Sequence, residues 1–384
     1  MALPDNSMSR ALASTVSSLF IPPRLRVAHL RTMSDRELRI LTSADVDKVL
    51  DSLDQKLAVD SQRAVFAAYS TDGDAEDVPG VRKLQLPLRH QLIAPDQTML
   101  IMPARVSGTM SCKIVSVPRA SSDGLPGSTI MMDDKTGKVK AIMNARRLTA
   151  LRNAAGSVLS YQALGEDRNP AHLVIFGSGT QADGHARAFL QTYPSIKKVT
   201  VVARRSTPRS RALVQDIASH FPAVTVAEGV ASYADGTAED GFDLAATVGD
   251  ADIICTMTSS TSALFPSAPV KAGAHMCLIG SYKPHMREVE DELVKRAGVV
   301  LVDSREACAA EAGELQGMEP SDLVELGEVV DVRTREEAVA KVNGAGDVNI
   351  FKSVGLGVQD VAISAVVLAE AERMGLGTVI PDYD

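Results

Sequence analysis

The segment IFGSGTQADGHARAFL, residues 175–190, places two closely spaced glycines between an apolar strand and a helix. Glycine at 177 permits a tight turn, and glycine at 179 lets the backbone approach a ligand closely. The helix that follows offers free N–H groups and a partial positive charge to a phosphate. The pattern predicts a loop that binds a dinucleotide pyrophosphate, with an ordinary strand-to-helix turn as the alternative. The residues expected to bind the cofactor are Gly177, Ser178, Gly179, Thr180, Gln181 and Ala182.

Short apolar runs of the same kind recur after this loop and alternate with helical patterns. The strand candidates are HLVIF, VTVVA, AVTVA, ADIICTM, AHMCLIG and VVLVD. Runs of this kind are typical of parallel strands that are buried on both faces. We therefore expect residues 166–339 to form a Rossmann-type, doubly wound α/β domain.

The chain before this domain has a different pattern. Thr42 and Asp45 have the spacing of a capping box, and a helix is predicted over 43–58, with a second over about 60–70. Residues 81–141 contain short β-rich runs separated by Gly, Pro and Asp, which predict a mostly antiparallel sheet. Helices are also expected over 148–164 and near the C-terminus, the latter capped by Asp360 and closed by Gly375. The class predicted for this part is α+β.

Composition excludes several kinds of function. A chain of 384 residues suits two domains, and a net charge of −8 argues against a nucleic-acid or anionic-membrane binder. The apolar stretch VAISAVVLA is too short to span a bilayer. The four cysteines are far apart and predict no zinc or other metal site; Cys255 and Cys277, in apolar runs, are expected to be buried, reduced thiols. Because reduced thiols indicate a reducing compartment, the expected location is the cytoplasm.

The N-terminal extension, residues 1–37, leaves a second location open. Met8, Leu12, Val16, Leu19 and Phe20 fall on one helical face, in a stretch with several arginines and few acids. The pattern resembles an organellar transit peptide, so the alternative location is mitochondrial. A loosely packed extension would explain the same residues.

The second predicted strand ends in Ala203-Arg204-Arg205-Ser206-Thr207. A carboxylate at this point would hydrogen-bond the ribose hydroxyls of NAD, whereas a guanidinium pairs with the 2′-phosphate of NADP. Arg204, Arg205 and Ser206 therefore predict NADP(H) as the cofactor. The alternative is a solvated arginine pair at a strand end.

Three cations stand in apolar surroundings before the glycine loop, namely Arg89, Lys113 and Arg152. Burying a cation is costly unless an anion accompanies it. Each one alone is explained by an ordinary ion pair, but together they could bind the carboxylate of a substrate.

Five stretches resemble the ornithine cyclodeaminase and mu-crystallin family in order and spacing. They are LIMPARVSGTMSCKIVSV, GLPGSTIMMDDKTGKVKAIMNARRLTALRNAAGSVLS, FGSGTQADGHARAF, CLIGSYKPHMREVE and FKSVGLGVQDVAISAVVLAEAERMGLG. The resemblance implies that Arg89, Lys113 and Arg152 bind an amino- or imino-acid carboxylate beside a nicotinamide. It also implies a homodimer formed through the sheet of the first domain. The C-terminal helix would return to that domain, which then comprises 38–165 and 340–384.

Two positions depart from the family pattern. Tyr282 stands where cyclodeaminases carry a catalytic aspartate, and a tyrosine is a poor base at neutral pH. Asn153 replaces a common threonine. Asn153 is expected to alter contacts with the cofactor's phosphates. Because Tyr282 disfavours cyclodeamination and Arg204 disfavours NAD, we expect NADPH-dependent reduction of a cyclic imino acid, such as Δ1-pyrroline-2-carboxylate or Δ1-piperideine-2-carboxylate. The alternatives are ornithine cyclodeamination, an open-chain amino-acid or opine-type dehydrogenase, and an NADPH-binding protein with little turnover.

The expected reaction assigns further roles. Lys113 would hydrogen-bond the substrate and relay a proton, and Asp360 would balance the charge, with a simple helix N-cap as the alternative for Asp360. Thr256 and Ser259, at the end of the ADIICTM strand, would line the ribose and nicotinamide.

Overall fold

The computed structural model describes residues 37–106, 108–119, 125–165 and 168–384. The predicted N-terminal extension lies outside these residues except for Glu37, so its targeting role remains a sequence prediction. The described residues divide into two compact units, one made of those up to Arg152 together with Leu356–Asp384, the other of those from Asn153 to Gly355. The sequence prediction drew these divisions at 165/166 and 339/340.

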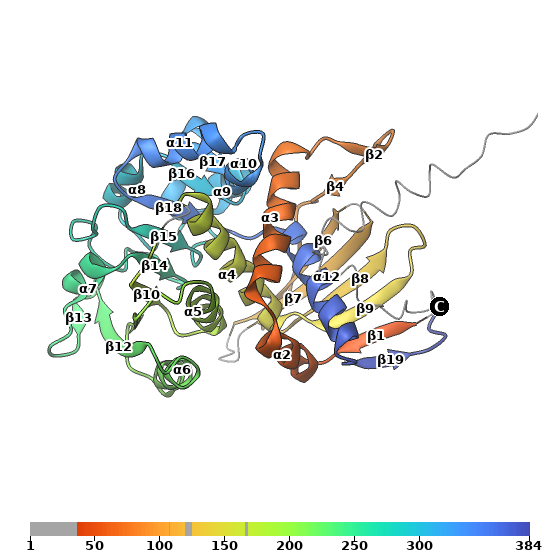
Figure 1. Ribbon diagram of the computed structural model, residues 1–384, viewed down its shortest axis with the longest axis horizontal. Coiled ribbons are helices and arrows are strands. Elements are labelled where there is room, and N and C mark those ends of the chain that lie inside the picture. The colour runs from red at the N-terminus through yellow and green to blue at the C-terminus, as the bar shows by residue number, and fades with distance from the viewer. Residues whose placement is uncertain (1–36, 107, 120–124, 166–167) are drawn as a thin grey trace, which may run out of the picture. The chain divides into compact units, whose positions relative to one another are not determined.

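The first unit is built on an eight-stranded sheet, seen with its helices in Figure 1. Its order is β19-β1-β9-β8-β7-β6-β4, with β5 also paired to β6. The predicted antiparallel character is confirmed for every pairing except β1 with β9, which is parallel. The bounds are β1 (Leu38–Leu41), β4 (Leu84–Gln85), β5 (His90–Ile93), β6 (Gln97–Val106), β7 (Thr109–Pro118), β8 (Gly127–Asp133), β9 (Val139–Asn144) and β19 (Thr378–Ile380). A separate hairpin joins β2 (Glu76–Val78) to β3 (Val81–Arg82).

Two helices follow β1, as predicted, but the break between them lies at Leu53–Asp54 and not at the predicted position between 58 and 60. The capping box of Thr42 and Asp45 is confirmed at the start of α2 (Ser43–Ser52). The helix ends at Leu53, which has an extended backbone, and Asp54 caps α3 (Gln55–Thr71) by accepting from the Lys56 backbone N–H. The predicted boundary was wrong because a side-chain cap at Asp54 outweighed an apolar periodicity that runs through the break.

The C-terminal helix α12 (Gly357–Arg373) packs against α2, α3 and the strands β6 to β8. It begins before Asp360, so the prediction that Asp360 caps this helix is wrong. The side chain of Gln359 accepts from the Leu356 N–H (2.9 Å) and satisfies the helix end instead. Asp360 is thereby left in the first turn, where it is buried against other side chains of this unit.

The second unit contains a nine-stranded sheet in the order β13-β12-β11-β10-β14-β15-β18-β16-β17. All its pairings are parallel except that of the edge strand β13, and the predicted Rossmann-type class is confirmed. Strands and helices are β10 (His172–Phe176), β11 (Lys198–Ala203), β12 (Thr225–Ser232), β13 (Thr237–Ala238), β14 (Ile253–Thr256), β15 (His275–Leu278), β16 (Val300–Val302), β17 (Leu323–Glu325), β18 (Asn349–Lys352), α5 (Thr180–Thr192), α6 (Pro208–His220), α7 (Leu244–Asp250), α8 (Asp291–Ala297), α9 (Arg305–Glu311), α10 (Leu326–Val330) and α11 (Arg335–Ala345). The helix α4 (Arg146–Ala163), predicted at 148–164, contributes residues to both units.

The sequence assigned residues 340–384 to the first domain, whereas β18 lies between β15 and β16 of the second unit's sheet. The strand sequence is NIFK, and its final lysine is fully buried. Four residues that end in a lysine carry too little apolar pattern to predict an interior strand. The strand is recognised only from its pairing with β15 and β16.

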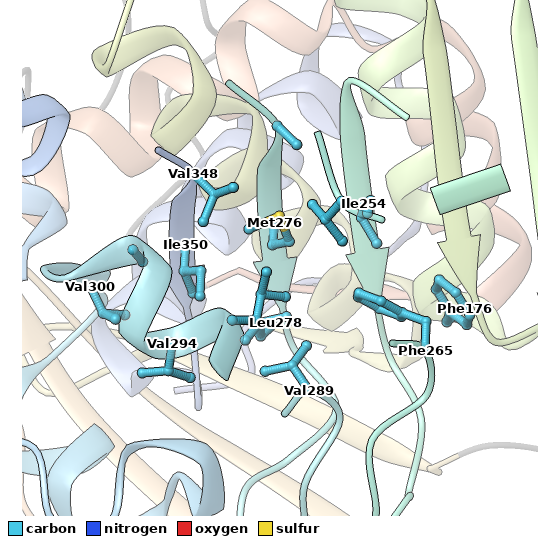
Figure 2. Close-up of a cluster of buried hydrophobic side chains, with 14 of the residues drawn as sticks. Phe176, Ile254, Phe265, Met276, Leu278, Val289, Val294, Val300, Val348 and Ile350 are labelled. Atoms are coloured by element: carbon cyan, nitrogen blue, oxygen red, sulfur yellow. The ribbon is translucent and has the colours of Figure 1, made fainter. Parts of the chain in front are cut away.

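Apolar side chains of this sheet form a continuous core with α8 and the segments around it. Figure 2 shows Ile254, Met276, Leu278 and Ile350 from neighbouring strands together with Phe176 and Phe265. The rings of Phe176 and Phe265 stack with centroids 5.0 Å apart. Cys255 and Cys277 are buried on adjacent strands, as predicted, and no disulfide involves the four cysteines, all of which lie in the described residues. Within the ranges that the structure describes, no helix is both long and apolar enough to cross a membrane.

Candidate active site

The glycine loop lies where the order of the second sheet reverses. Strands β11 and β12 extend the sheet on one side of β10, and β14 and β15 extend it on the other. In open α/β sheets, ligands bind at the carboxyl ends of the strands beside such a switch point. The loop leaves β10 there, and the Gly177 N–H donates to the Val202 carbonyl (3.0 Å).

Gly177 is required by its backbone conformation, and Gly179 leaves the start of the next helix uncovered. Gly177 has φ +118°, and a Cβ at this position would lie 3.1 Å from the carbonyl oxygen of Met257. Gly179 is the N-cap of α5 and makes no side-chain capping bond. A Cβ on Gly179 would lie 3.1 Å from Nη2 of Arg209, so this guanidinium lies directly over the loop. A bare backbone, an uncapped helix start and a neighbouring cation together fit a pyrophosphate.

The other predicted loop residues surround this helix start. Ser178, Thr180 and Gln181 are half-buried, and Ala182 is buried. The Gln181 amide oxygen accepts from Asn153 Nδ2 (3.2 Å). Asn153, one of the two residues that depart from the family pattern, therefore contacts the glycine loop.

The end of β11 carries the residues predicted to select the cofactor. Arg204 and Arg205 are exposed, as a site for an incoming phosphate requires. Ser206 is engaged with protein groups, because its hydroxyl donates to Glu228 (3.0 Å) and accepts from Arg211 (2.9 Å). Sequence reasoning missed Glu228 and Arg209. Glu228 belongs to β12, so no local pattern connects it with this corner.

Thr256 and Ser259 were both predicted to line the ribose and nicotinamide. Ser259 is exposed past the end of β14. Thr256 is the last residue of β14 and is fully buried, and its hydroxyl donates to the carboxylate of Glu288 (2.8 Å). The Thr256 side chain is therefore bonded to Glu288 inside the protein, whereas Ser259 is accessible from outside.

A second polar cluster lies in the first unit. Lys113 on β7, Arg152 on α4 and Asp360 on α12 are each at most 4% exposed. The Lys113 ammonium lies 2.7 Å from Oδ2 of Asp360, and Nε of Arg152 lies 3.3 Å from Oδ1 of the same carboxylate. Two of the three predicted cations are therefore brought together by Asp360.

Burial lowers the pKa of Lys113 below that of an ordinary lysine, although the charge of Asp360 opposes this change. The charges of Arg152 and Arg89 lower the same pKa further, which places Arg89 within electrostatic range of the cluster. Arg89 is half-buried in the segment between β4 and β5. A lysine whose pKa is lowered is a better proton donor near neutral pH than an ordinary one.

Gln359 is a member of this cluster that sequence reasoning missed. Its amide oxygen accepts from Nη1 of Arg152 (3.0 Å) and so orients the guanidinium. The sequence feature that could have identified Gln359 is its position next to Asp360 on α12. In the second unit, Tyr282 is 40% exposed, and the Lys283 ammonium lies 5.5 Å from the centre of its ring. The described residues contain no group of three or more His, Cys, Asp or Glu side chains suited to a metal ion.

The sequence model of the ornithine cyclodeaminase/mu-crystallin family matches residues 43–374. Over 293 residues the chain is 30% identical to a Delta(1)-pyrroline-2-carboxylate reductase of Bacillus cereus, covering 73% of this chain and 83% of the relative. It is 29% identical over 328 residues to the ketimine reductase mu-crystallin of Rattus norvegicus, covering 84% of this chain and 94% of the relative. The fold resembles that of Thermococcus litoralis Delta(1)-pyrroline-2-carboxylate reductase, solved with NADH and L-proline, with a TM-score of 0.72, 20% identity, and coverage of 88% of this chain and 99% of that one.

Proposed function

This chain belongs to the ornithine cyclodeaminase/mu-crystallin family, and we propose that it reduces a cyclic imino acid to the corresponding cyclic amino acid with NADPH. In the proposed reaction, hydride adds to the imine carbon and a proton adds to the nitrogen. The product is an amino acid of the proline or pipecolate type. Relatives named as pyrroline-carboxylate and ketimine reductases support the class, an NAD(P)-dependent oxidoreductase acting on carbon–nitrogen bonds.

The observation that carries the proposal is the buried cluster of Lys113, Arg152 and Asp360. A substrate carboxylate pairs with Arg152, whose planar guanidinium suits a bidentate contact. Arg89 adds positive charge beside it. Asp360 keeps Lys113 charged and oriented in a place where burial alone would favour the neutral amine.

Lys113 is the proposed proton donor. A protonated imine accepts hydride more readily than a neutral one, so a donor beside the nitrogen accelerates the step. The lowered pKa of Lys113 suits it to release a proton near neutral pH. The resulting amine takes a proton back from solvent, and Asp360 stabilises the ammonium form that results.

The residues of the second unit are proposed to hold the cofactor, which when bound supplies the hydride. The backbone of residues 177–182 and the start of α5 bind the pyrophosphate. Arg204 and Arg205 bind the 2′-phosphate, with Ser206 held between Glu228 and Arg211 beside them. Ser259 lies toward the nicotinamide side, beyond β14.

Tyr282 supports reduction over cyclodeamination. Ornithine cyclodeamination needs a base for the substrate amine, and the phenol of a tyrosine is a poor base compared with a carboxylate. A one-way reduction does not need that base.

The test is an NADPH-oxidation assay with Δ1-pyrroline-2-carboxylate and Δ1-piperideine-2-carboxylate from about pH 5 to 8. We expect turnover of at least one of them and no ammonia release from ornithine. The Arg152→Gln variant should lower kcat/KM for the imino acid about 100-fold through loss of the carboxylate contact.

The matched control is Arg147→Gln on the same helix, where Arg147 pairs with Asp47 (3.0 Å), outside the cluster. It should keep kcat/KM within about twofold of the wild type. The absence of turnover of either imino acid across the pH range would refute the proposed reaction.

A further inference from the structure

Glu288 is a fully buried carboxylate that joins two loops at the carboxyl edge of the second unit's sheet. Its Oε1 accepts from the backbone N–H (2.7 Å) and the hydroxyl (2.8 Å) of Thr258, beyond β14. Its Oε2 accepts from the Gly280 N–H (2.7 Å), beyond β15, and from the Thr256 hydroxyl (2.8 Å). Each carboxylate oxygen therefore binds two donors.

A second buried carboxylate supports the first. Glu314 accepts from the Glu288 N–H (2.8 Å) and from the Ser281 hydroxyl, and the Lys352 ammonium lies 3.5 Å from it. Lys352 also donates to Ser281 (2.8 Å). Burial raises the pKa of Glu288, so its ionised form is costly in this place. A buried polar cluster of this kind is often less favourable than well-packed apolar side chains. Its presence here therefore points to a role other than stability.

The loops held by Glu288 contact the glycine loop. A Cβ on Gly177 would lie 3.1 Å from the carbonyl oxygen of Met257, the residue between Thr256 and Thr258. A Cβ on Gly280 would lie 2.2 Å from the carbonyl oxygen of Thr258. Three loops at the carboxyl edge are thus in close contact, and Glu288 determines the spacing of two of them.

These loops lie on one side of the switch point, and Arg204 lies on the other. A dinucleotide bound with its pyrophosphate on the glycine loop places its adenosine toward β11 and its nicotinamide toward β14 and β15. We infer that Glu288 is a positioning residue for the nicotinamide half of the cofactor, acting through the loops of Thr258 and Gly280. The inference rests on the proposed function only in taking the ligand to be a nicotinamide dinucleotide.

The test separates the two halves of the ligand by binding alone. Glu288→Gln replaces one acceptor oxygen with an amide that faces the N–H donors, which releases one loop. We expect the Kd for NADPH, measured by the fluorescence of the bound cofactor, to rise about tenfold. The Kd for 2′,5′-ADP, which contains only the adenosine half, should stay within about twofold of the wild type, measured by calorimetry.

Glu290→Gln is the matched control, because Glu290 is two residues away and accepts from Ser267 N–H (2.7 Å) and the Tyr233 hydroxyl (2.8 Å), outside the two loops. It should change neither Kd. Equal weakening of both ligands by Glu288→Gln, or of neither, would overturn the inference. If Glu288→Gln does not fold, Thr258→Val removes one donor to the same carboxylate, and a rise in the NADPH Kd of about threefold with unchanged 2′,5′-ADP binding is expected. An unchanged NADPH Kd in Thr258→Val would equally overturn it.

Failure of the proposed function is distinguishable from failure of this inference. A wild type that binds cofactor without reducing imino acids refutes only the function. If the wild type prefers NADH, the same comparison is made with NADH and ADP as the two ligands.

Discussion

At the scale of single residues, the pairing of Lys113 with Asp360 controls the chemistry proposed for the first unit. The two side chains lie 2.7 Å apart and are almost completely buried. Burial lowers the pKa of Lys113 and Asp360 raises it, so the protonation of the lysine depends on a single neighbouring carboxylate. A change at Asp360 should therefore be visible as a change in pH dependence.

We predict that Asp360→Asn moves the alkaline limb of kcat/KM to lower pH. The protonated lysine is the active form, so activity falls as pH rises through its pKa, and removing the negative charge lowers that pKa further. The measurement is the pH profile of kcat/KM with one imino acid, whose own titration is common to all variants. Glu370→Gln, on the same helix but paired with Arg373 (2.8 Å), is the control and should leave the limb in place. A limb that stays in place or moves to higher pH in Asp360→Asn would show that Lys113 is not the titrating group.

At the scale of elements, the turn from β11 into α6 gathers the groups proposed to select the cofactor. Arg204 and Arg205 end the strand, and Arg209 on the helix lies over Gly179. Thr207 caps α6 through a reciprocal pair of bonds with Ser210, so the turn has a defined geometry. Charge on this one turn should decide between the two nicotinamide cofactors.

We predict that Arg204→Asp reverses the proposed preference for NADPH over NADH. A carboxylate repels the 2′-phosphate and can bind the ribose hydroxyls, so the ratio of kcat/KM values should fall about 100-fold or more. Steady-state kinetics with both cofactors measures this ratio. Lys197→Asp, which makes the same change of charge just before the amino end of β11, should leave the ratio within about twofold. A ratio that is unchanged in Arg204→Asp would show that the 2′-phosphate lies elsewhere.

At the scale of the whole molecule, the predicted homodimer has a candidate surface in the first unit. The strand β5 is exposed along its length, and three apolar side chains in and before it are more than half exposed, namely Leu88, Leu92 and Ile93. Several exposed apolar side chains close together in one segment are typical of a protein–protein contact. We propose that two copies associate through this strand and the sheet beside it.

We predict that light scattering coupled to gel filtration gives about twice the chain mass of 40.7 kDa for the wild type. Leu92→Lys combined with Ile93→Lys should yield monomers, because two buried ammonium groups would oppose association. Val332→Lys changes an isolated apolar side chain that is 94% exposed in the second unit, and it should leave the dimer intact. A monomeric wild type, or a double variant that stays dimeric, would contradict the proposed surface.

Much of this molecule could be predicted from local sequence. Apolar runs identified β10, β11, β12, β14, β15 and β16, and the glycine spacing identified the start of α5. The capping box could be predicted because its two members, Thr42 and Asp45, are only three residues apart in the sequence. The break at Leu53 and the short strand β18 were missed, because a side-chain cap and a four-residue interior strand leave little periodic signal.

The sequence by itself determined the class of the fold, the position of the glycine loop and the identity of the cations, because these depend on periodicity and on residue type. Only the tertiary structure decided which groups meet. Asp360 joins Lys113 to Arg152 across three elements, and Glu288 joins two loops through donors up to 32 residues away. Such contacts arise from strand order and helix packing, so a local pattern does not contain them.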